Sequence, residues 1–273
     1  MPRSPGGFSL ACQATQTCPP GERGIFYQGV DPASGAPLGT RTRIPYASPF
    51  APSQSVALAA LHHPSGRVLA ATTSSQGLID LTDVATGARV PLAGAGRGNS
   101  RLRLAADPSG RIWVVWRTRA GDIGVIRSNV GATRWGAFVG VDLPTGARTL
   151  WGVSADAQAG VLDIVGQLSV SRGSGNPDTG LGAWHTQVRP GLTLTLVTAA
   201  VRPGFRAVFR VQDAGDPVAG ARVRLGSRSV LTNVRGQASL LIPETAAPGR
   251  RVVRATKAGY TADSDTLTVR PLQ

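Results

Sequence analysis

Two hydrophobic patterns follow one another along the chain. In residues 56–141 the short apolar runs are continuous, as in Ile112–Trp116, whereas from Leu192 onward apolar and polar residues alternate, as in Phe205–Val211. A continuously apolar strand needs cover on both faces, and an alternating strand turns one face to the core and the other to water. The patterns therefore predict an all-β chain with two architectures, one over residues 1–190 and one over residues 191–273.

The first architecture repeats with a period of 44 residues. Residues 56–90 align without gaps with residues 100–134 at nine identical positions, mostly in turns, such as Pro64/Pro108 and Gly66/Gly110. Turn geometry fixes Gly and Pro, while a core accepts any β-former of suitable size. Four short strands at this period are typical of a β-propeller blade.

Weaker copies flank these two blades. Ile25–Tyr27 with the turn at residues 31–36 resembles the second half of a blade, and the turn at residues 156–160 with the strand Val161–Val165 repeats the pattern about 50 residues downstream. This gives about four blades, and propellers close with four to eight. The sequence allows either a small closed ring or an incomplete ring. We expect the incomplete ring, with earlier blades outside this chain.

The second architecture carries a different set of turns, DAGDPVAGARV at residues 213–223, TNVRGQA at residues 232–238 and ATKAGY at residues 255–260. Over residues 203–270 it resembles bacterial Ig-like and carboxypeptidase-regulatory-like modules. The resemblance implies a sandwich of seven short strands without an active site, used as a spacer, stalk or adhesive unit. We expect Gly236 to close a hairpin between Val230–Thr232 and Gln237–Leu241, and Tyr260 to pack near a strand end.

The second blade contains a motif that resembles a family signature. Ser128 and Trp135 stand seven residues apart after its third strand, as in the Asp-box S-x-D-x-G-x-T-W of BNR, or sialidase-like, propeller repeats. Val130 and Ala132 replace the Asp and Gly of the box. A second candidate has one residue too many before its Trp: Asn176, Asp178, Gly180 and Trp184. The resemblance covers residues 20–190 and implies a propeller in which the box is a structural turn clamp.

Sialidases of this fold use an arginine triad, a Tyr/Glu nucleophilic pair and an acid/base Asp. Their tripeptide Arg-Ile-Pro occurs as Arg43–Pro45, but far before the next strand. The residues available for the Tyr/Glu pair are Glu22, Tyr27 and Tyr46. The acids lie mostly in turns, as Asp31 and Asp107 do before Pro, where Asp is a common turn former. We therefore expect no catalytic residues, and a sialidase-like glycoside hydrolase, truncated in this chain, stays as the alternative.

Charge and aromatic residues suggest ligands. The chain has 28 Arg, one Lys and a net charge of +14, which ordinarily suggests nucleic acid or an anionic surface. No basic run exceeds two residues, so we expect no focused basic patch and no nucleic-acid partner, and rank an anionic polysaccharide or cell envelope somewhat above nucleic acid. Trp113 and Trp116 lie three apart in one strand and are expected to face opposite sides of it, in the core. Three Trp residues are expected to be better exposed and able to stack on sugars: Trp135, Trp151 and Trp184.

Other special chemistry is sparse. Cys12 and Cys18 either close a small disulfide loop or stay free thiols. The three histidines, His62, His63 and His185, lack metal-ligand spacing, so we expect no metal site. Residues 94–98 are glycine-rich but open no helix, which argues against a phosphate site. The sequence has no run of 18 apolar residues and no apolar core of a signal peptide.

These patterns favour a non-enzymatic binding or adhesion protein that is extracellular or on the cell surface, even though a signal segment is absent from this sequence. The blades would form the recognition surface for a glycan, an envelope component or a protein, and the C-terminal module would be the spacer. No cofactor and no membrane span are expected. The ligand, the state of the two cysteines and the oligomeric state are left open.

Overall fold

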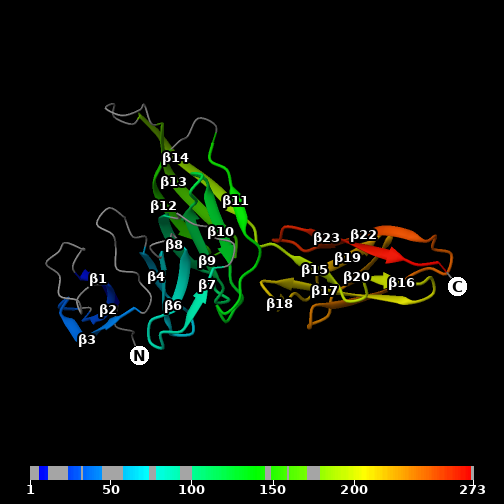
Figure 1. Cartoon of the computed structure of the whole chain (residues 1–273), viewed down its shortest axis with the longest axis horizontal. Helices are drawn as coiled ribbons and strands as arrows, with labels where there is room; N and C mark the ends of the chain where they lie inside the picture. Colours follow the sequence, from blue (N-terminus) through cyan, green and yellow to red (C-terminus); the bar gives the residue numbers. More distant parts are fainter. Residues whose placement is uncertain are drawn as a thin grey trace.

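The computed structural model describes residues 6–11, 24–31, 33–44, 58–73, 78–92, 100–144, 149–158, 160–170 and 179–271. Every regular element in these ranges is a β-strand, so the predicted all-β class is confirmed. Four sheets stand in a row, followed by a two-layered sandwich that carries the C-terminus (Figure 1). No helix in the described ranges is long and apolar enough to cross a bilayer.

The two sheets in the middle of the row are the two predicted blades. Each is an antiparallel meander of four strands. The first contains β4 (Leu58–His62), β5 (Val68–Thr73), β6 (Ile79–Asp83) and β7 (Arg89–Pro91). The second contains β8 (Ser100–Ala106), β9 (Ile112–Arg117), β10 (Ile123–Arg127) and β11 (Val139–Val141).

The 44-residue repeat is confirmed at the level of backbone geometry. β5 and β9 begin 44 residues apart, as do β6 and β10. The turn before β5 and the turn before β9 have the same hydrogen bonds, with the amide of Gly66 donating to His63 and that of Gly110 to Asp107. Both glycines have a positive φ, 93° and 89°, a region that favours glycine. The repeated Gly therefore reflects a backbone requirement.

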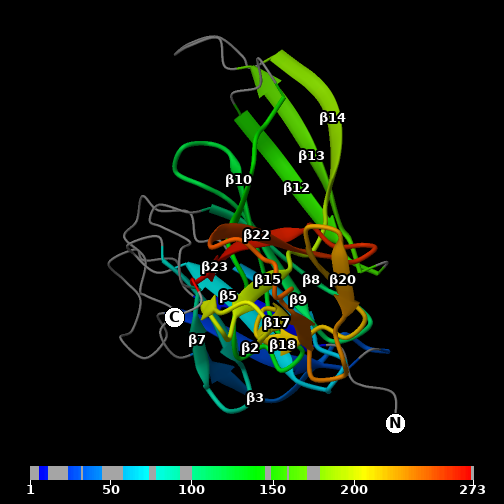
Figure 2. The same cartoon turned by 90° about the vertical axis from the view of Figure 1, so that its right-hand side faces the viewer.

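Three-stranded sheets stand at the two ends of the row (Figures 1 and 2). One contains β1 (Gly6–Ala11), β2 (Gly24–Val30) and β3 (Pro37–Arg43). The other contains β12 (Thr149–Asp156), β13 (Leu162–Val170) and β14 (Thr179–Val188). The predicted weak copies thus each form a sheet, and the four described sheets do not close into a ring.

Apolar clusters fill the spaces between neighbouring sheets, as blade packing requires. One cluster joins the two four-stranded sheets and includes Leu69, Leu81 and Trp116. The next joins the β8–β11 sheet to the β12–β14 sheet and includes Trp113 and Leu162. Trp113 and Trp116 are buried in different clusters, which confirms that they face opposite sides of β9.

The last sheet of the row is covered on one face only. Along β13 the buried side chains of Leu162, Ile164 and Leu168 alternate with exposed ones, and Val165 is 47% exposed. The strands in the middle of the row, such as β10, are buried on both faces. The outer face of the β12–β14 sheet is therefore a free surface of the described structure.

The C-terminal part is a sandwich of two sheets. One sheet contains β15 (Thr193–Leu196), β17 (Arg206–Asp213), β18 (Asp216–Pro217) and β21 (Gln237–Leu241). The other has the order β16 (Ala200–Val201), β23 (Asp263–Val269), β22 (Gly249–Thr256), β19 (Arg222–Leu225) and β20 (Arg228–Leu231). The two sheets contain nine described strands, of which seven have four or more residues, where seven short strands were expected.

A separate apolar cluster fills the sandwich, with Phe209, Val223 and Leu267 fully buried. The hairpin expected around Gly236 is wrong, because β20 pairs with β19 and β21 pairs with β17 in the other sheet. The turn at Gly236 instead carries the chain from one sheet to the other. The boundary between residues 190 and 191 stays a prediction.

Candidate functional site

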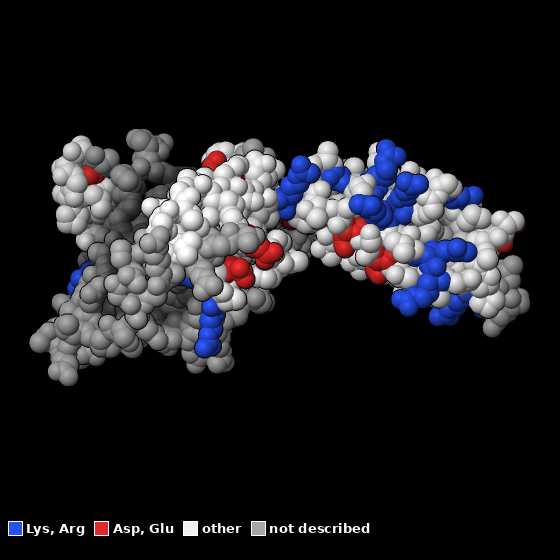
Figure 3. All heavy atoms as spheres, turned by 90° about the horizontal axis from the view of Figure 1, so that it is seen from above, with Lys and Arg blue, Asp and Glu red and all other residues white. Residues whose placement is uncertain are grey.

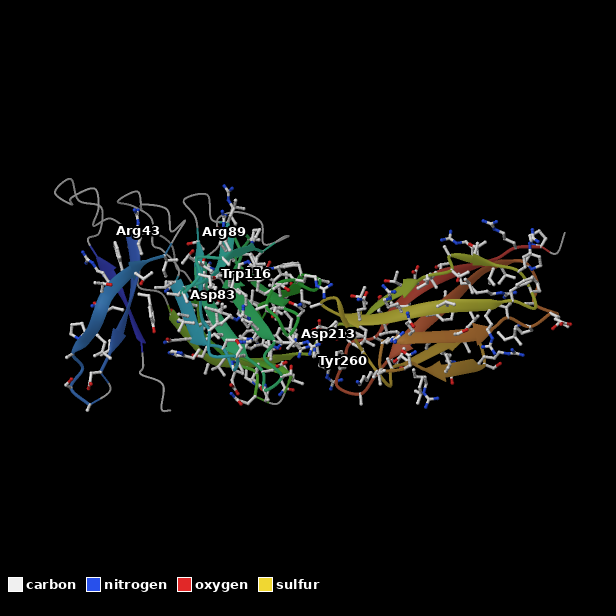
Figure 4. All side chains as sticks on the ribbon, turned by 90° about the horizontal axis from the view of Figure 1, so that it is seen from below. Arg43, Asp83, Arg89, Trp116, Asp213 and Tyr260 are labelled. Carbon is white, nitrogen blue, oxygen red and sulfur yellow. The ribbon has the colours of Figure 1, made fainter. Side chains whose placement is uncertain are left out.

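The sandwich meets the second blade through a cluster of arginines and aspartates. The turn between β17 and β18 brings Asp213 and Asp216 to the end of the sandwich that lies against the blades, and Figure 4 shows Asp213 at this junction. The blade supplies Arg111, the residue before β9, and Arg127 at the end of β10. We call these residues, together with Asp107 and Arg134, the junction cluster.

Arg127 is the centre of the junction cluster. One of its terminal nitrogens donates to Asp107 in the same blade, and the other donates to Asp213 in the sandwich. All three side chains are buried, with exposed fractions of 8%, 1% and 3% for Arg127, Asp107 and Asp213. The guanidinium carbon also lies 5.2 Å from the centre of the Trp113 ring. The buried guanidinium group of Arg127 therefore links the two parts of the chain.

A second set of contacts surrounds this link. Arg111 donates through Nη2 to Asp216 Oδ2 at 3.0 Å, and its Nε lies 3.4 Å from Asp213 Oδ2. The backbone amide of Val130 donates to Asp216 at 2.8 Å. The ion pair between Arg134 and Asp216 is long, at 3.8 Å, and the Arg134 side chain is 61% exposed. This pair therefore contributes little to the stability of the junction. The junction cluster thus joins the parts through several directed polar contacts.

The two carboxylates that share Arg127 have opposite pKa shifts. Burial raises the pKa of Asp213, against the opposing charges of Arg127 and Arg111. Burial acts in the same direction at Asp107, but hydrogen bonds from the Ser109 hydroxyl and the Arg111 amide, with the charge of Arg127, hold its pKa below 3.8. The polar contacts therefore outweigh burial at Asp107, whereas burial outweighs them at Asp213.

The free face of the β12–β14 sheet carries a second polar group of side chains. Asp163 accepts hydrogen bonds from Gln187 Nε2 and from His185 Nε2, each at 2.8 Å. These two contacts lower the pKa of Asp163. Asp156 stands directly opposite Asp163 in the β12–β13 register. Carboxylate, imidazole and amide groups on one exposed face suit recognition of a hydroxyl-rich ligand. We call these four residues the end-face group.

Most residues singled out in the sequence do not meet in one site. Arg43 lies exposed on β3, far from Asp213 (Figure 4). Asp31 caps its own turn by accepting the amides of Ala33 and Ser34, as expected for a turn former. Several other candidates lie outside the described residues: Cys12, Cys18, Glu22, Tyr46, residues 94–98, Asn176 and Asp178.

The tryptophans expected to be exposed are not open platforms. Trp135 is half-buried against the cluster between the two four-stranded sheets, and Trp184 packs against the next cluster. The side chain of Trp151 lies outside the described part of the structure. Trp135 and Trp184 are thus more exposed than the buried Trp113 and Trp116, as expected, but each is only partly exposed. Their stacking on sugars stays a prediction. Tyr260 packs against the sandwich core, as expected.

His63 has structural contacts at both ring nitrogens. His63 occupies the position in the repeat that Asp107 occupies in the next blade. Its Nδ1 lies 2.6 Å from the Ser65 hydroxyl, and the Asp107 carboxylate likewise lies 2.6 Å from the Ser109 hydroxyl. Its Nε2 lies 2.6 Å from the carbonyl oxygen of Gly110 in the next blade. The sequence analysis did not predict the junction cluster. One signal for it was present: the repeat aligns His63 with Asp107, which indicates that this turn position holds a polar side chain in both blades.

Comparison with known proteins identifies no family. No protein-family model matches the chain, and no curated protein matches it. Among solved structures, the chain is similar over 91% of its length to the extracellular domain of a hybrid two-component system from B. thetaiotaomicron, with 10% identity, a TM-score of 0.31 and 42% of that chain covered. It is also similar over 91% of its length to the Dos1 propeller, with 12% identity, a TM-score of 0.35 and 66% of that chain covered.

A third solved structure, concerned with Dscam isoform specificity, matches 78% of this chain and 59% of its own, with 11% identity and a TM-score of 0.23. The chain thus spans between 42% and 66% of the length of these structures. With TM-scores this low, the fold assignment rests on the sheets and apolar clusters described above.

Proposed function

We propose that this chain is a non-enzymatic binding protein displayed outside the cell, in which the row of blades is the recognition surface and the C-terminal sandwich is its spacer. The junction cluster is the observation that carries the proposal. A sandwich tethered by a flexible linker would let the blades swing freely, whereas the buried Arg127 link holds them in one orientation. A fixed orientation is what a display module requires.

The proposed recognition surface is the end-face group on the β12–β14 sheet. Its carboxylates and imidazole are exposed, and Asp163 is held in place by His185 and Gln187. Hydrogen-bond donors and acceptors held in place on a firm sheet lose little freedom on binding. A hydroxyl-rich ligand, such as a glycan of a cell surface, matches this chemistry.

We also propose that the blades are degenerate BNR-type repeats and that the sandwich is an Ig-like or carboxypeptidase-regulatory-like module. The segment from Ser128 to Trp135 closes with a bridge between these two residues, and Ala132 has a φ of 52° at the glycine position of the Asp-box. Both features support a degenerate BNR-type turn. The motifs of the sandwich support an Ig-like or carboxypeptidase-regulatory-like module, a type used as a spacer.

The test is a glycan array probed with the full chain, followed by titration of the best ligand. We expect Asp163→Asn and His185→Ala to weaken binding, and Thr195→Ala, an exposed change on the sandwich, to leave it unchanged. Unchanged binding in both end-face variants would refute the assigned surface. Turnover of a fluorogenic sialoside by the chain, abolished in Arg43→Ala, would favour the sialidase-like hydrolase instead.

A further inference from the structure

The outer face of the five-stranded sheet of the sandwich is basic. In β19 and β22 the side chains of Val223 and Ala255 point into the core. Because side chains alternate along a strand, their neighbours point outward. Four of the outward side chains are arginines, and we call them the arginine stripe: Arg222, Arg224, Arg250 and Arg254.

Two arginines of the stripe oppose each other directly. Arg224 pairs with Arg254 in the β19–β22 register, and like charges placed opposite one another destabilise a sheet. Arg224 donates to the carbonyl oxygen of Gly226 at 2.7 Å, and Arg222 donates to Ser229 at 3.2 Å. Neither contact neutralises a charge. An anion lying between the two guanidinium groups would remove the repulsion.

The sandwich has five acids, and among the described ion pairs none joins one of them to the stripe: Asp213, Asp216, Glu244, Asp263 and Asp265. Asp213 and Asp216 belong to the junction cluster. Asp263 stands opposite the buried Ala255 and Asp265 opposite the buried Val253, so both are in the inward phase of β23. Within the described part of the chain, none of the four arginines forms an ion pair.

The stripe has the length of a polymer site. It runs from the level of Arg222 to that of Arg250, six residues along β22, or about 20 Å at the usual rise of a strand. Hydroxyl groups flank it in the same outward register, from Ser229, Ser264 and Thr268. Figure 3 shows blue Lys and Arg atoms gathered over the sandwich, in contrast to the mostly uncharged described surface of the blades.

We propose that the arginine stripe binds a linear anionic polysaccharide. Guanidinium groups form forked hydrogen bonds with carboxylate or sulfate groups, and the flanking hydroxyl groups can bond the sugar hydroxyls. Binding here makes the sandwich an envelope anchor in its own right, which goes beyond its proposed role as a spacer. The site is independent of the end-face group.

The same face is poorly suited to the other polyanions. Proteins that hold single-stranded nucleic acid stack bases on aromatic side chains, and the outward positions of β19, β20, β22 and β23 contain Arg, Ser, Thr, Val and Leu but no aromatic residue. A second copy of the face would bring like charges together. A carbohydrate polymer requires neither stacking nor self-complementarity.

The test measures binding of the full chain to immobilised polygalacturonate and heparin over a range of salt concentrations. We expect binding that weakens with salt and that falls by about tenfold or more in R224S/R254S, the factor expected when charge-assisted hydrogen bonds are lost. The matched control R206S/R210S removes two exposed arginines from β17 in the other sheet, and should change the affinity by less than about twofold. R224K/R254K keeps the charge and loses the fork, so its affinity should lie between those of wild type and R224S/R254S.

Three outcomes would overturn the proposal. Equal losses in R224S/R254S and R206S/R210S would show that net charge alone drives binding. Binding to oligo(dT) with none to either polysaccharide would assign the face to nucleic acid. Self-association in the ultracentrifuge that R224S/R254S abolishes would assign it to a second copy of the chain. Far-UV circular dichroism and urea midpoints of all variants exclude loss of folding as the cause.

Discussion

Arg127→Met is the most informative single change in this chain. Methionine keeps an unbranched apolar side chain against Trp113, which lies 5.2 Å from the guanidinium carbon, and removes the charge that Asp107 and Asp213 share. Both carboxylates would stay buried, with exposed fractions of 1% and 3%. The variant therefore isolates the ionic link between blade and sandwich from the packing around it.

The expected cost follows from the remaining partners. Removing one member of a buried ion pair typically costs about 3–5 kcal/mol, because the other charge is left buried and unpaired. Here Asp213 keeps Arg111 at 3.4 Å, and Asp107 keeps the hydroxyl and amide of Ser109. These contacts place the loss at the lower end, about 3 kcal/mol.

The measurement is urea unfolding followed by tryptophan fluorescence, with the free energy of unfolding and the m-value fitted for each variant. Arg134→Met is the matched control, because its side chain is 61% exposed and 3.8 Å from Asp216; it should cost less than about 0.5 kcal/mol. If the link holds the two parts as one cooperative unit, Arg127→Met should also split or broaden the transition. Equal costs for Arg127→Met and Arg134→Met would refute the reasoning.

Three further changes test other features of the structure. Asp107→Asn should destabilise the protein at pH 7; because its folded pKa is lowered, the stability it gives is present above about pH 4 and lost as the pH falls through the folded pKa, so the difference from wild type should shrink in unfolding curves below that pH. Gly124→Ala should cost about 1–3 kcal/mol, since the new Cβ would lie 2.5 Å from the Trp116 ring, whereas Gly152→Ala, with no atom within 4 Å, should cost far less. Thr232→Val should cost about 1–3 kcal/mol in the same assay, because the buried hydroxyl donates to one backbone carbonyl at 2.6 Å and accepts from one backbone amide at 2.9 Å.

The blades could be predicted because their constraints are local. The left-handed turns at Gly66 and Gly110 demand glycine, and continuous apolar runs such as Ile112–Trp116 demand cover on both faces. Both constraints leave a periodic trace in the sequence. The opposite orientation of Trp113 and Trp116 follows from the geometry of a strand alone.

The junction cluster could not be predicted, because its members gain their role only from tertiary structure. Arg127 and Asp213 are 86 residues apart, and Arg111 and Asp216 are 105 apart. In the sequence Asp213 and Asp216 look like ordinary turn formers, and they do form a turn. Nothing in the local pattern shows that the same carboxylates also face two arginines of another sheet.

The arginine stripe was missed for a related reason. A search for runs of basic residues finds at most two in a row, and the expectation of no focused patch was wrong. Arg224 and Arg254 are 30 residues apart in the chain but directly opposite in the sheet. A surface patch on a β-sheet is assembled at every second residue across several strands, so a run of charges along the chain is the wrong signal for it.

The end of the row shows how burial and sequence pattern constrain each other. In β9 the run from Ile112 to Trp116 is buried throughout, and no polar residue interrupts it. In β13 the outward positions hold Asp163, Val165 and Gln167, so a further sheet packed on this face would bury the Asp163 carboxylate away from water. Burying a charge is costly unless it is paired, and the Asp156 carboxylate directly opposite Asp163 would add repulsion. The polar pattern of β13 therefore suits a face in contact with solvent or a polar ligand. The faces between blades are apolar and covered, so we expect the row of sheets to recognise a ligand at this outer face.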